Sequence, residues 1–188
     1  MRTFVAFPLD PRLHPIVSRV QDSLRRADAP VRWVAPTNLH LTLKFLGEVT
    51  EEAAALFAEQ FRSNVSSYGF LRLEWEGVGR FPSGGTPRVV WIGCRGDLSK
   101  LEGVARAADR GAEQIGVPPE RRRFSPHLTI GRVKSPRNKS ALLQVLENQA
   151  QVPIGLQVVK EIFLYQSTLT PDGPIYDVVE SFPLRSKL

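Results

Sequence analysis

Two short stretches of the sequence carry the same pattern of side chains. Residues 40–43 read His-Leu-Thr-Leu, and residues 127–130 read His-Leu-Thr-Ile. Polar and apolar residues alternate in each copy, which is typical of a strand with one buried face, so the histidine and threonine of a copy point to the same side. A single such pattern is weak evidence, because most strand histidines are structural. Its repetition favours a functional role for both copies.

The repeated residues suit acid-base chemistry. The ordinary pKa of histidine is about 6.5, so His40 and His127 can each serve as a general acid or a general base near neutral pH. Thr42 and Thr129 follow two residues later, and their hydroxyls can donate hydrogen bonds to negative charge in a transition state. We predict these four as catalytic residues. His14 has no such partner and lies beside an apolar helical stripe, so we interpret it as structural.

Two further residues are substrate-binding candidates because of their positions on these strands. Lys44 has the same strand parity as the first-motif histidine, which places it at the border of the site. Arg132 has the opposite parity to His127, but Gly131 can allow a β-bulge that turns Arg132 toward the site. The alternative for Arg132 is an outward side chain in solvent.

The positive charge of the chain is concentrated beside the second motif. The net charge is +6, and residues 118–139 account for it with seven basic side chains against one acidic one. A local positive field of this kind raises the concentration of an anionic substrate. We predict that Arg121, Arg122 and Arg123 bind substrate there, with a solvated basic loop as the alternative.

Length and composition favour one globular domain spanning residues 1–188. The chain is 42% hydrophobic and 23% charged, which is ordinary for a soluble protein. It has no long apolar run and no basic-then-apolar N-terminus, so we expect a cytoplasmic protein that does not span a membrane. Cys94 is the one cysteine, which excludes an internal disulfide, and we expect it in the core. No cysteine or histidine cluster at metal-ligand spacing accompanies it, and we predict no metal and no cofactor.

Alternating strands and helices must bring the two motifs together. Apolar stripes predict helices over 13–24, 54–68, 98–115 and 140–149, the second of them capped by Thr50. Strands are predicted over 3–7, 40–47, 71–77, 89–93, 127–130, 156–165 and 176–184. One motif strand lies in each half of the chain. This order predicts an α+β fold of two similar lobes, with the motif strands facing each other across a cleft.

Four stretches together resemble a known family. The sequence is similar to RNA 2′,3′-cyclic phosphodiesterases, which belong to the two-histidine (2H) phosphoesterases and to the 2′-5′ RNA ligase family. The stretches that carry the resemblance are Trp33–Gly47, Phe81–Gly93, Ser125–Arg132 and Ser167–Tyr176. The resemblance covers nearly the whole chain. It implies a bilobal fold of two antiparallel sheets, related by pseudo-twofold symmetry, with outer helices and a central cleft.

The same resemblance implies an activity. The protein would be a monomeric enzyme that hydrolyses RNA 2′,3′-cyclic phosphate ends, including those of tRNA fragments, to 2′-phosphate ends without a metal. His40 would donate a proton and His127 would accept one. This fits the chemistry, because water must attack phosphorus in line with the departing oxygen and so needs a base on one side and an acid on the other. Trp33, Phe81 and Phe124 have rings that can stack on bases, with core packing as the alternative.

Other functions stay open at this point. The runner-up enzyme reaction is 2′-5′ joining of RNA ends, which is the reverse reaction in the same site. A noncatalytic RNA-binding module would use the basic segment and the aromatic rings but would leave the two histidine motifs unexplained. A metal-dependent phosphodiesterase would need clustered ligands that the sequence lacks. The C-terminal residues Ser186, Lys187 and Leu188 match a peroxisomal address, which we interpret as coincidence.

Overall fold

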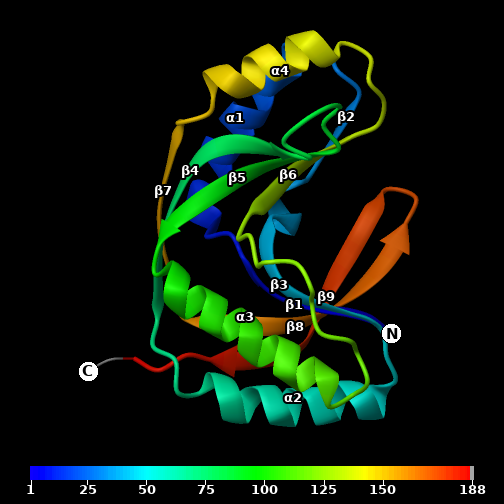
Figure 1. Ribbon diagram of the computed structural model, residues 1–188, viewed down its shortest axis with the longest axis vertical. Coiled ribbons are helices and arrows are strands. Elements are labelled where there is room, and N and C mark those ends of the chain that lie inside the picture. The colour runs from blue at the N-terminus through cyan, green and yellow to red at the C-terminus, as the bar shows by residue number, and fades with distance from the viewer. Residues whose placement is uncertain (187–188) are drawn as a thin grey trace.

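Two antiparallel sheets, each covered on one face by two helices, make up the computed structural model, which describes residues 1–186 (Figure 1). The four-stranded sheet has the order β3-β1-β8-β9, and the five-stranded sheet has the order β2-β6-β5-β4-β7. The predicted α+β class and the pair of antiparallel sheets are confirmed. The strands are β1 (Arg2–Pro8), β2 (Val31–Trp33), β3 (His40–Glu48), β4 (Leu71–Phe81), β5 (Val89–Gly96), β6 (Leu128–Val133), β7 (Pro153–Val159), β8 (Glu161–Thr170) and β9 (Gly173–Pro183).

Helices α2 (Glu51–Val65) and α3 (Leu98–Glu113) cover the four-stranded sheet. The predicted cap of α2 is confirmed, because Thr50 Oγ1 accepts a hydrogen bond of 3.2 Å from the backbone N–H of Ala53. Phe57 and Phe61 lie on the buried face of α2 and are fully enclosed. These helices therefore anchor the sheet that carries the first motif.

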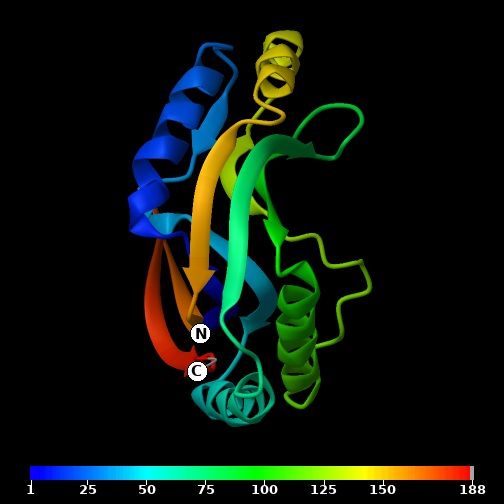
Figure 2. The same ribbon diagram turned by 90° about the vertical axis from the view of Figure 1, so that its left-hand side faces the viewer.

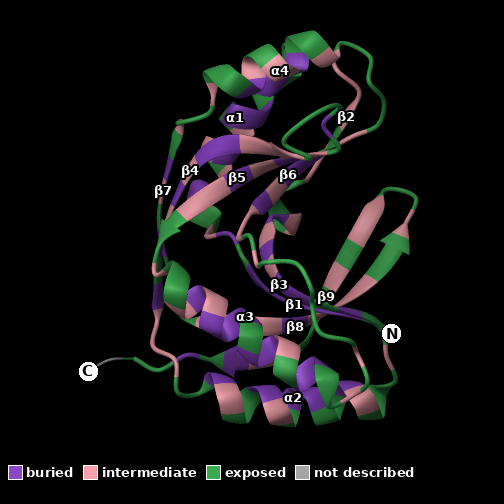
Figure 3. Ribbon diagram, in the orientation of Figure 1, coloured by how far each residue is buried: buried purple, intermediate pink, exposed green. Residues whose placement is uncertain are grey.

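Helices α1 (His14–Arg25) and α4 (Lys139–Asn148) cover the five-stranded sheet. The two helices lie side by side at one end of the molecule, away from α2 and α3 (Figure 2). The short 3₁₀ turns η1 (Pro11–Leu13) and η2 (Pro36–Asn38) precede α1 and β3. In all four helices the buried residues form one stripe against a sheet, as the apolar periodicity predicts (Figure 3).

The sequence order suggested that each sheet would come from one half of the chain. The structure shows a different arrangement. The four-stranded sheet combines strands from both chain ends, and the five-stranded sheet contains β2 together with the middle strands. A predicted continuous strand over 156–165 is wrong for the same reason. The chain leaves the five-stranded sheet at Val159 and enters the other sheet at Glu161, so two strands replace one. Both segments are apolar enough to read as one run.

A buried glutamine ties the two sheets together. Gln157 on β7 is 7% exposed and accepts a hydrogen bond of 2.9 Å from Trp75 Nε1 within its own sheet. Its Nε2 donates across to the carbonyl of Pro8 at the end of β1, also at 2.9 Å. A buried amide with its polar atoms paired favours one arrangement of its partners. This contact therefore helps to fix the relative position of the two sheets, which carry the two motifs.

Two other expectations concern single features. Cys94 is partly buried against the core, and burial raises the pKa of its thiol to about 11. Its sulfur is therefore protonated at neutral pH and a poor nucleophile. Within residues 1–186, no helix is both long enough and apolar enough to cross a membrane. The C-terminal tripeptide extends beyond the described residues.

Candidate active site

Both motif histidines are held in the same way. His40 is the first residue of β3, and its Nδ1 lies 2.7 Å from the carbonyl oxygen of Asn38. His127 directly precedes β6, and its Nδ1 lies 2.7 Å from the carbonyl oxygen of Ser125. A carbonyl can only accept a hydrogen bond, so Nδ1 carries the proton in each ring. In both imidazoles Nε2 is left to exchange protons with a substrate.

Aromatic rings surround each imidazole. The ring centroid of His40 lies 5.0 Å from that of Phe4 and 5.1 Å from that of Tyr176, and these residues line a small pocket of about 80 Å³. The ring of His127 meets Phe81 edge-on with centroids 5.0 Å apart. The rings limit how far each imidazole can turn.

The environment of His40 disfavours its charged form. Burial lowers the pKa of His40, and the nearby positive charge of Arg132 acts in the same direction, as does His127 when it is protonated. The hydrogen bond to the carbonyl of Asn38 opposes this effect because it favours the protonated ring. Strands β3 and β6, which carry the two motifs, are also in contact with each other, so the motifs lie close together.

Thr42 and Thr129 follow the two histidines at a spacing of two residues. Both are partly exposed, and within residues 1–186 neither hydroxyl takes part in a hydrogen bond with the protein. Each therefore has a hydroxyl available to a ligand on the same strand face as the neighbouring imidazole.

A β-bulge in β3 overturns the predicted position of Lys44. Thr42 and Lys44 pair with consecutive residues of β1, so Leu43 is an extra residue and the strand parity changes after it. Lys44 points under α3 instead of toward His40 and is 8% exposed. Its Nζ lies 2.5 Å from Asp109 Oδ1 and donates to the carbonyl of Pro118 at 2.9 Å. The prediction that Lys44 borders the site beside His40 is therefore wrong.

The equivalent bulge in β6 turns Arg132 toward the site. Thr129 and Gly131 pair with consecutive residues of β5, which makes Ile130 the extra residue. Arg132 therefore lies on the same strand face as Thr129, as the bulge hypothesis predicted, and its side chain is exposed. The charge of Arg132 lowers the pKa of His40. Burial raises the pKa of Tyr176, and the charge of Arg132 partly offsets that increase.

The other predicted substrate-binding residues lie on the segment between α3 and β6. Arg121, Arg122 and Arg123 are exposed, and none of their side chains forms an ion pair with any residue that the structure describes. Phe124 is partly buried and packs against the hydrophobic core. Trp33 lies beside the guanidinium of Arg25 on α1.

Two residues at the site were missed by sequence reasoning. Tyr176 lies in one of the four stretches noted above, and nothing in its local pattern distinguishes it from a core aromatic. Gln21 on α1 is 3% exposed, and its Nε2 donates to the carbonyls of Val34 and the bulged Ile130 at 2.9 and 3.0 Å. The sequence could have indicated Gln21, because it is a polar residue within the otherwise apolar stripe of helix α1.

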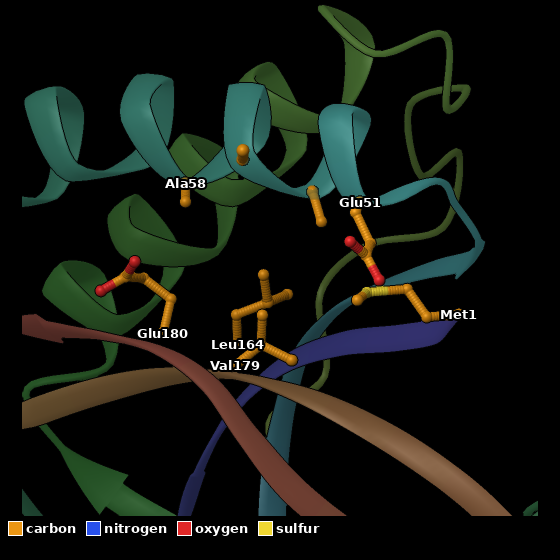
Figure 4. A pocket seen from close by; sticks show the side chains of 8 residues that line it. Met1, Glu51, Ala58, Leu164, Val179 and Glu180 are labelled. Atoms are coloured by element: carbon orange, nitrogen blue, oxygen red, sulfur yellow. The ribbon is translucent and has the colours of Figure 1, made fainter.

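A larger pocket lies elsewhere and contains none of the motif residues. It has a volume of about 260 Å³ and lies between α2 and the covered face of the four-stranded sheet. Met1 and Glu51 line one end and Glu180 the other, with Leu164 and Val179 below (Figure 4). Among residues 1–186, no group of three or more His, Cys, Asp or Glu side chains is arranged to hold a metal ion.

Comparison with known proteins extends these observations. A family model described as the 2′-5′ RNA ligase superfamily matches residues 7–169. A Methanothermobacter thermautotrophicus protein named RNA 2′,3′-cyclic phosphodiesterase is 40% identical over 184 residues, which is 98% of this chain and 99% of that protein. A protein of the same name from Aquifex aeolicus is 35% identical, covering 98% of this chain and 97% of its own.

Solved structures agree with the sequence matches. The crystal structure of TT0787 of Thermus thermophilus covers the whole of both chains with a TM-score of 0.80 and 30% sequence identity. The apo form of E. coli LigT has a TM-score of 0.78 and 26% identity, covering 99% of this chain and 98% of its own. The family model and the full-length relatives lead to one conclusion: this chain belongs to the 2′-5′ RNA ligase superfamily.

Proposed function

We propose that this protein hydrolyses RNA 2′,3′-cyclic phosphate ends and leaves 2′-phosphate ends. The observation that carries the proposal is the matched pair of imidazoles. Each donates Nδ1–H to the carbonyl two residues upstream and keeps Nε2 free. The names of the full-length relatives support the same activity.

The two imidazoles have opposite tasks in this reaction. Neutral His127 accepts a proton at Nε2 from the attacking water, whose oxygen forms a bond to phosphorus. As the bond from phosphorus to the 3′ oxygen breaks, protonated His40 donates a proton from Nε2 to that oxygen. The product is a 2′-phosphate beside a free 3′-hydroxyl. Proton exchange with solvent then restores both rings.

The low pKa of His40 gives the substrate a part in catalysis. Burial and nearby positive charge favour the neutral ring in the free protein. A cyclic phosphate carries one negative charge, which favours the imidazolium form when it binds nearby. The general acid, His40, is therefore protonated more readily when substrate is bound.

Other groups stabilise the charge that builds on the nonbridging oxygens. The hydroxyls of Thr42 and Thr129 and the guanidinium of Arg132 serve as donors in the transition state. Charge-assisted hydrogen bonds from arginine are stronger than neutral ones. Lys44 acts differently, because its ammonium is already bound to Asp109 and Pro118.

The basic segment and the aromatic rings suit RNA rather than a free nucleotide alone. Arg121, Arg122 and Arg123 contact phosphates beyond the terminal nucleotide, and Phe124 follows them directly in the same segment. RNA fragments with cyclic ends, those of tRNA included, are the substrates. The protein acts as a monomer, since one chain supplies both histidines. Residues 1–188 form one domain, and the cytoplasm is its expected location.

Product analysis on an RNA oligonucleotide with a 2′,3′-cyclic phosphate end tests the proposal. We expect a single product with a 2′-phosphate, formed equally well in the presence of a chelator because acid, base and phosphate donors are all side chains. A 3′-phosphate product would mean that the substrate lies in the reverse orientation between the two histidines. No hydrolysis at any pH between 5 and 9 would refute the proposed function.

A further inference from the structure

Two arginines stand directly opposite each other on neighbouring strands of the five-stranded sheet. Arg32 on β2 pairs in register with Arg132 on β6. Side chains of residues paired in this way project from the same face of a sheet, and like charges placed there destabilise it. Both residues are exposed, and among residues 1–186 neither forms an ion pair. The protein itself leaves this repulsion uncompensated.

The pair lies at the edge of the proposed active site. The bulge at Ile130 turns Arg132 toward the histidines, as described above. Arg32 reaches the other sheet, because a Cβ atom built on Gly173 would lie 3.2 Å from its Nη2. Gly173 begins β9 at the tip of the hairpin formed by β8 and β9. Arg32 therefore spans the edge of the site between β2 and this hairpin.

The acidic residue next to Gly173 does not neutralise Arg32. Asp172 precedes Gly173 in the hairpin turn and is exposed, but no ion pair joins it to Arg32 in the described part of the chain. The hairpin is held from another side, where Asn38 Nδ2 donates to the carbonyl of Pro174 at 3.0 Å. Arg32 thus keeps its guanidinium available next to a fixed loop.

From this arrangement we propose that Arg32 binds the 5′-phosphate group of the terminal nucleotide while Arg132 faces the cyclic phosphate. The inference rests on the proposed function. A cyclic-phosphate end places one further phosphate within the same nucleotide, on its 5′ oxygen. Two adjacent guanidiniums match two phosphates joined by one ribose. The protein then prefers RNA ends and 5′-phosphorylated cyclic nucleotides to cyclic nucleotides with a 5′-hydroxyl.

The test compares one substrate with and without the 5′-phosphate. For adenosine 2′,3′-cyclic phosphate and its 5′-phosphorylated form, we expect Arg32→Gln to lower kcat/KM of the 5′-phosphorylated form alone, by about 10- to 100-fold. Arg32→Lys should recover part of the loss. Arg106→Gln removes the same charge from the exposed face of α3 and should leave the ratio unchanged.

Three outcomes would overturn the inference. Equal losses on both substrates would assign Arg32 to the reacting phosphate or to the fold, and no change on either would make it a solvated side chain. If Asp172→Asn reproduced the effect of Arg32→Gln on both substrates, the arginine would serve only to hold the hairpin.

A binding measurement separates this inference from the proposed function. Calorimetry can compare adenosine 2′,5′-bisphosphate with adenosine 2′-phosphate, and neither requires turnover. We expect the wild-type protein to bind the bisphosphate more tightly and Arg32→Gln to abolish the difference. If the protein hydrolysed no cyclic phosphate but kept this difference, only the proposed function would fail. If it hydrolysed both substrates but bound the two nucleotides equally, only the role of Arg32 would fail.

Discussion

Lys44 Nζ and Asp109 Oδ1 lie 2.5 Å apart beneath helix α3, and this ion pair fixes the segment that leads to the second motif. Lys44 also donates to the carbonyl of Pro118, while the carboxylate of Asp109 accepts the backbone N–H of Glu120 at 3.1 Å. Lys44 lies four residues after His40. Together with Asp109 it thus holds the segment at Pro118 and Glu120, which lies a few residues before His127. The pair connects the two motifs through the backbone.

Replacing only one member of this pair should be more harmful than replacing both. Lys44→Met leaves the Asp109 carboxylate partly buried without its cation, and we expect a loss of about 2–4 kcal/mol in the free energy of unfolding. The double variant Lys44→Met with Asp109→Leu should recover part of that loss. Urea denaturation measures both. Equal stability of the single and wild-type proteins would show that the pair contributes nothing.

The two histidine variants should have matching effects on turnover. We expect His40→Ala and His127→Ala each to lower kcat by about 10²–10⁴-fold with the fold intact, because each removes one of two proton transfers. The double variant should be little worse than either single one, since the two groups act as a unit. Steady-state kinetics and circular dichroism check this. A single variant with wild-type turnover would contradict the two-imidazole mechanism.

The titration of His40 should reveal its surroundings. Burial lowers its pKa, so NMR of the ring should show a midpoint below the ordinary value of about 6.5. Arg132→Gln removes a nearby positive charge and should move that midpoint upward. Adding adenosine 2′-phosphate should also raise it, because an anion favours the imidazolium. A downward shift with either change would contradict the proposed electrostatics.

The same histidine predicts a pH dependence of stability. With a folded pKa below the unfolded one, protonation favours the unfolded state, so the contribution of neutral His40 is fully present above about pH 6.5. It is lost as the pH falls from there through the lower folded pKa. His40→Asn should therefore show a flatter decline in the free energy of unfolding between pH 7 and 5. Parallel curves for the two proteins would exclude this linkage.

The arginine triplet should affect long substrates only. Replacing Arg121, Arg122 and Arg123 with Ser should raise KM for an oligonucleotide and flatten its salt dependence, by up to about two units of log-log slope at about 0.7 per phosphate. Turnover of a cyclic mononucleotide should stay nearly constant. Equal losses on both substrates would place these arginines at the reacting phosphate, and no loss would make the segment a solvated face.

The sequence predicted those features that depend on local patterns. Alternation identified both motif strands, and apolar stripes located the helices, because burial of one face leaves a periodic record. The same parity rule gave the wrong position for Lys44, since nothing in residues 40–48 marks Leu43 as a bulge. For Arg132 the rule needed a bulge and Gly131 suggested one. Whether a bulge forms depends on the partner strand. The spacing of residues along a strand therefore predicts which face a side chain lies on only as far as the first bulge.

Nonlocal pairing was also invisible in the sequence. No strand was predicted over residues 31–33, yet β2 forms there and pairs with β6, and the break near Lys160 separates strands of different sheets. These features depend on which strands meet after the chain has crossed between sheets. Tyr176 could be placed beside His40, and Arg32 opposite Arg132, only when those pairings were known.

The strand order of the four-stranded sheet determines when the protein can become active during synthesis. β1 lies between β3 and β8, so its second neighbour does not exist until residues 161–170 have left the ribosome. The five-stranded sheet needs nothing beyond Val159 and can form earlier. Until β8 arrives, β1 is an open edge to which another nascent chain can pair. The sheet that holds His40 is thus the last part to assemble.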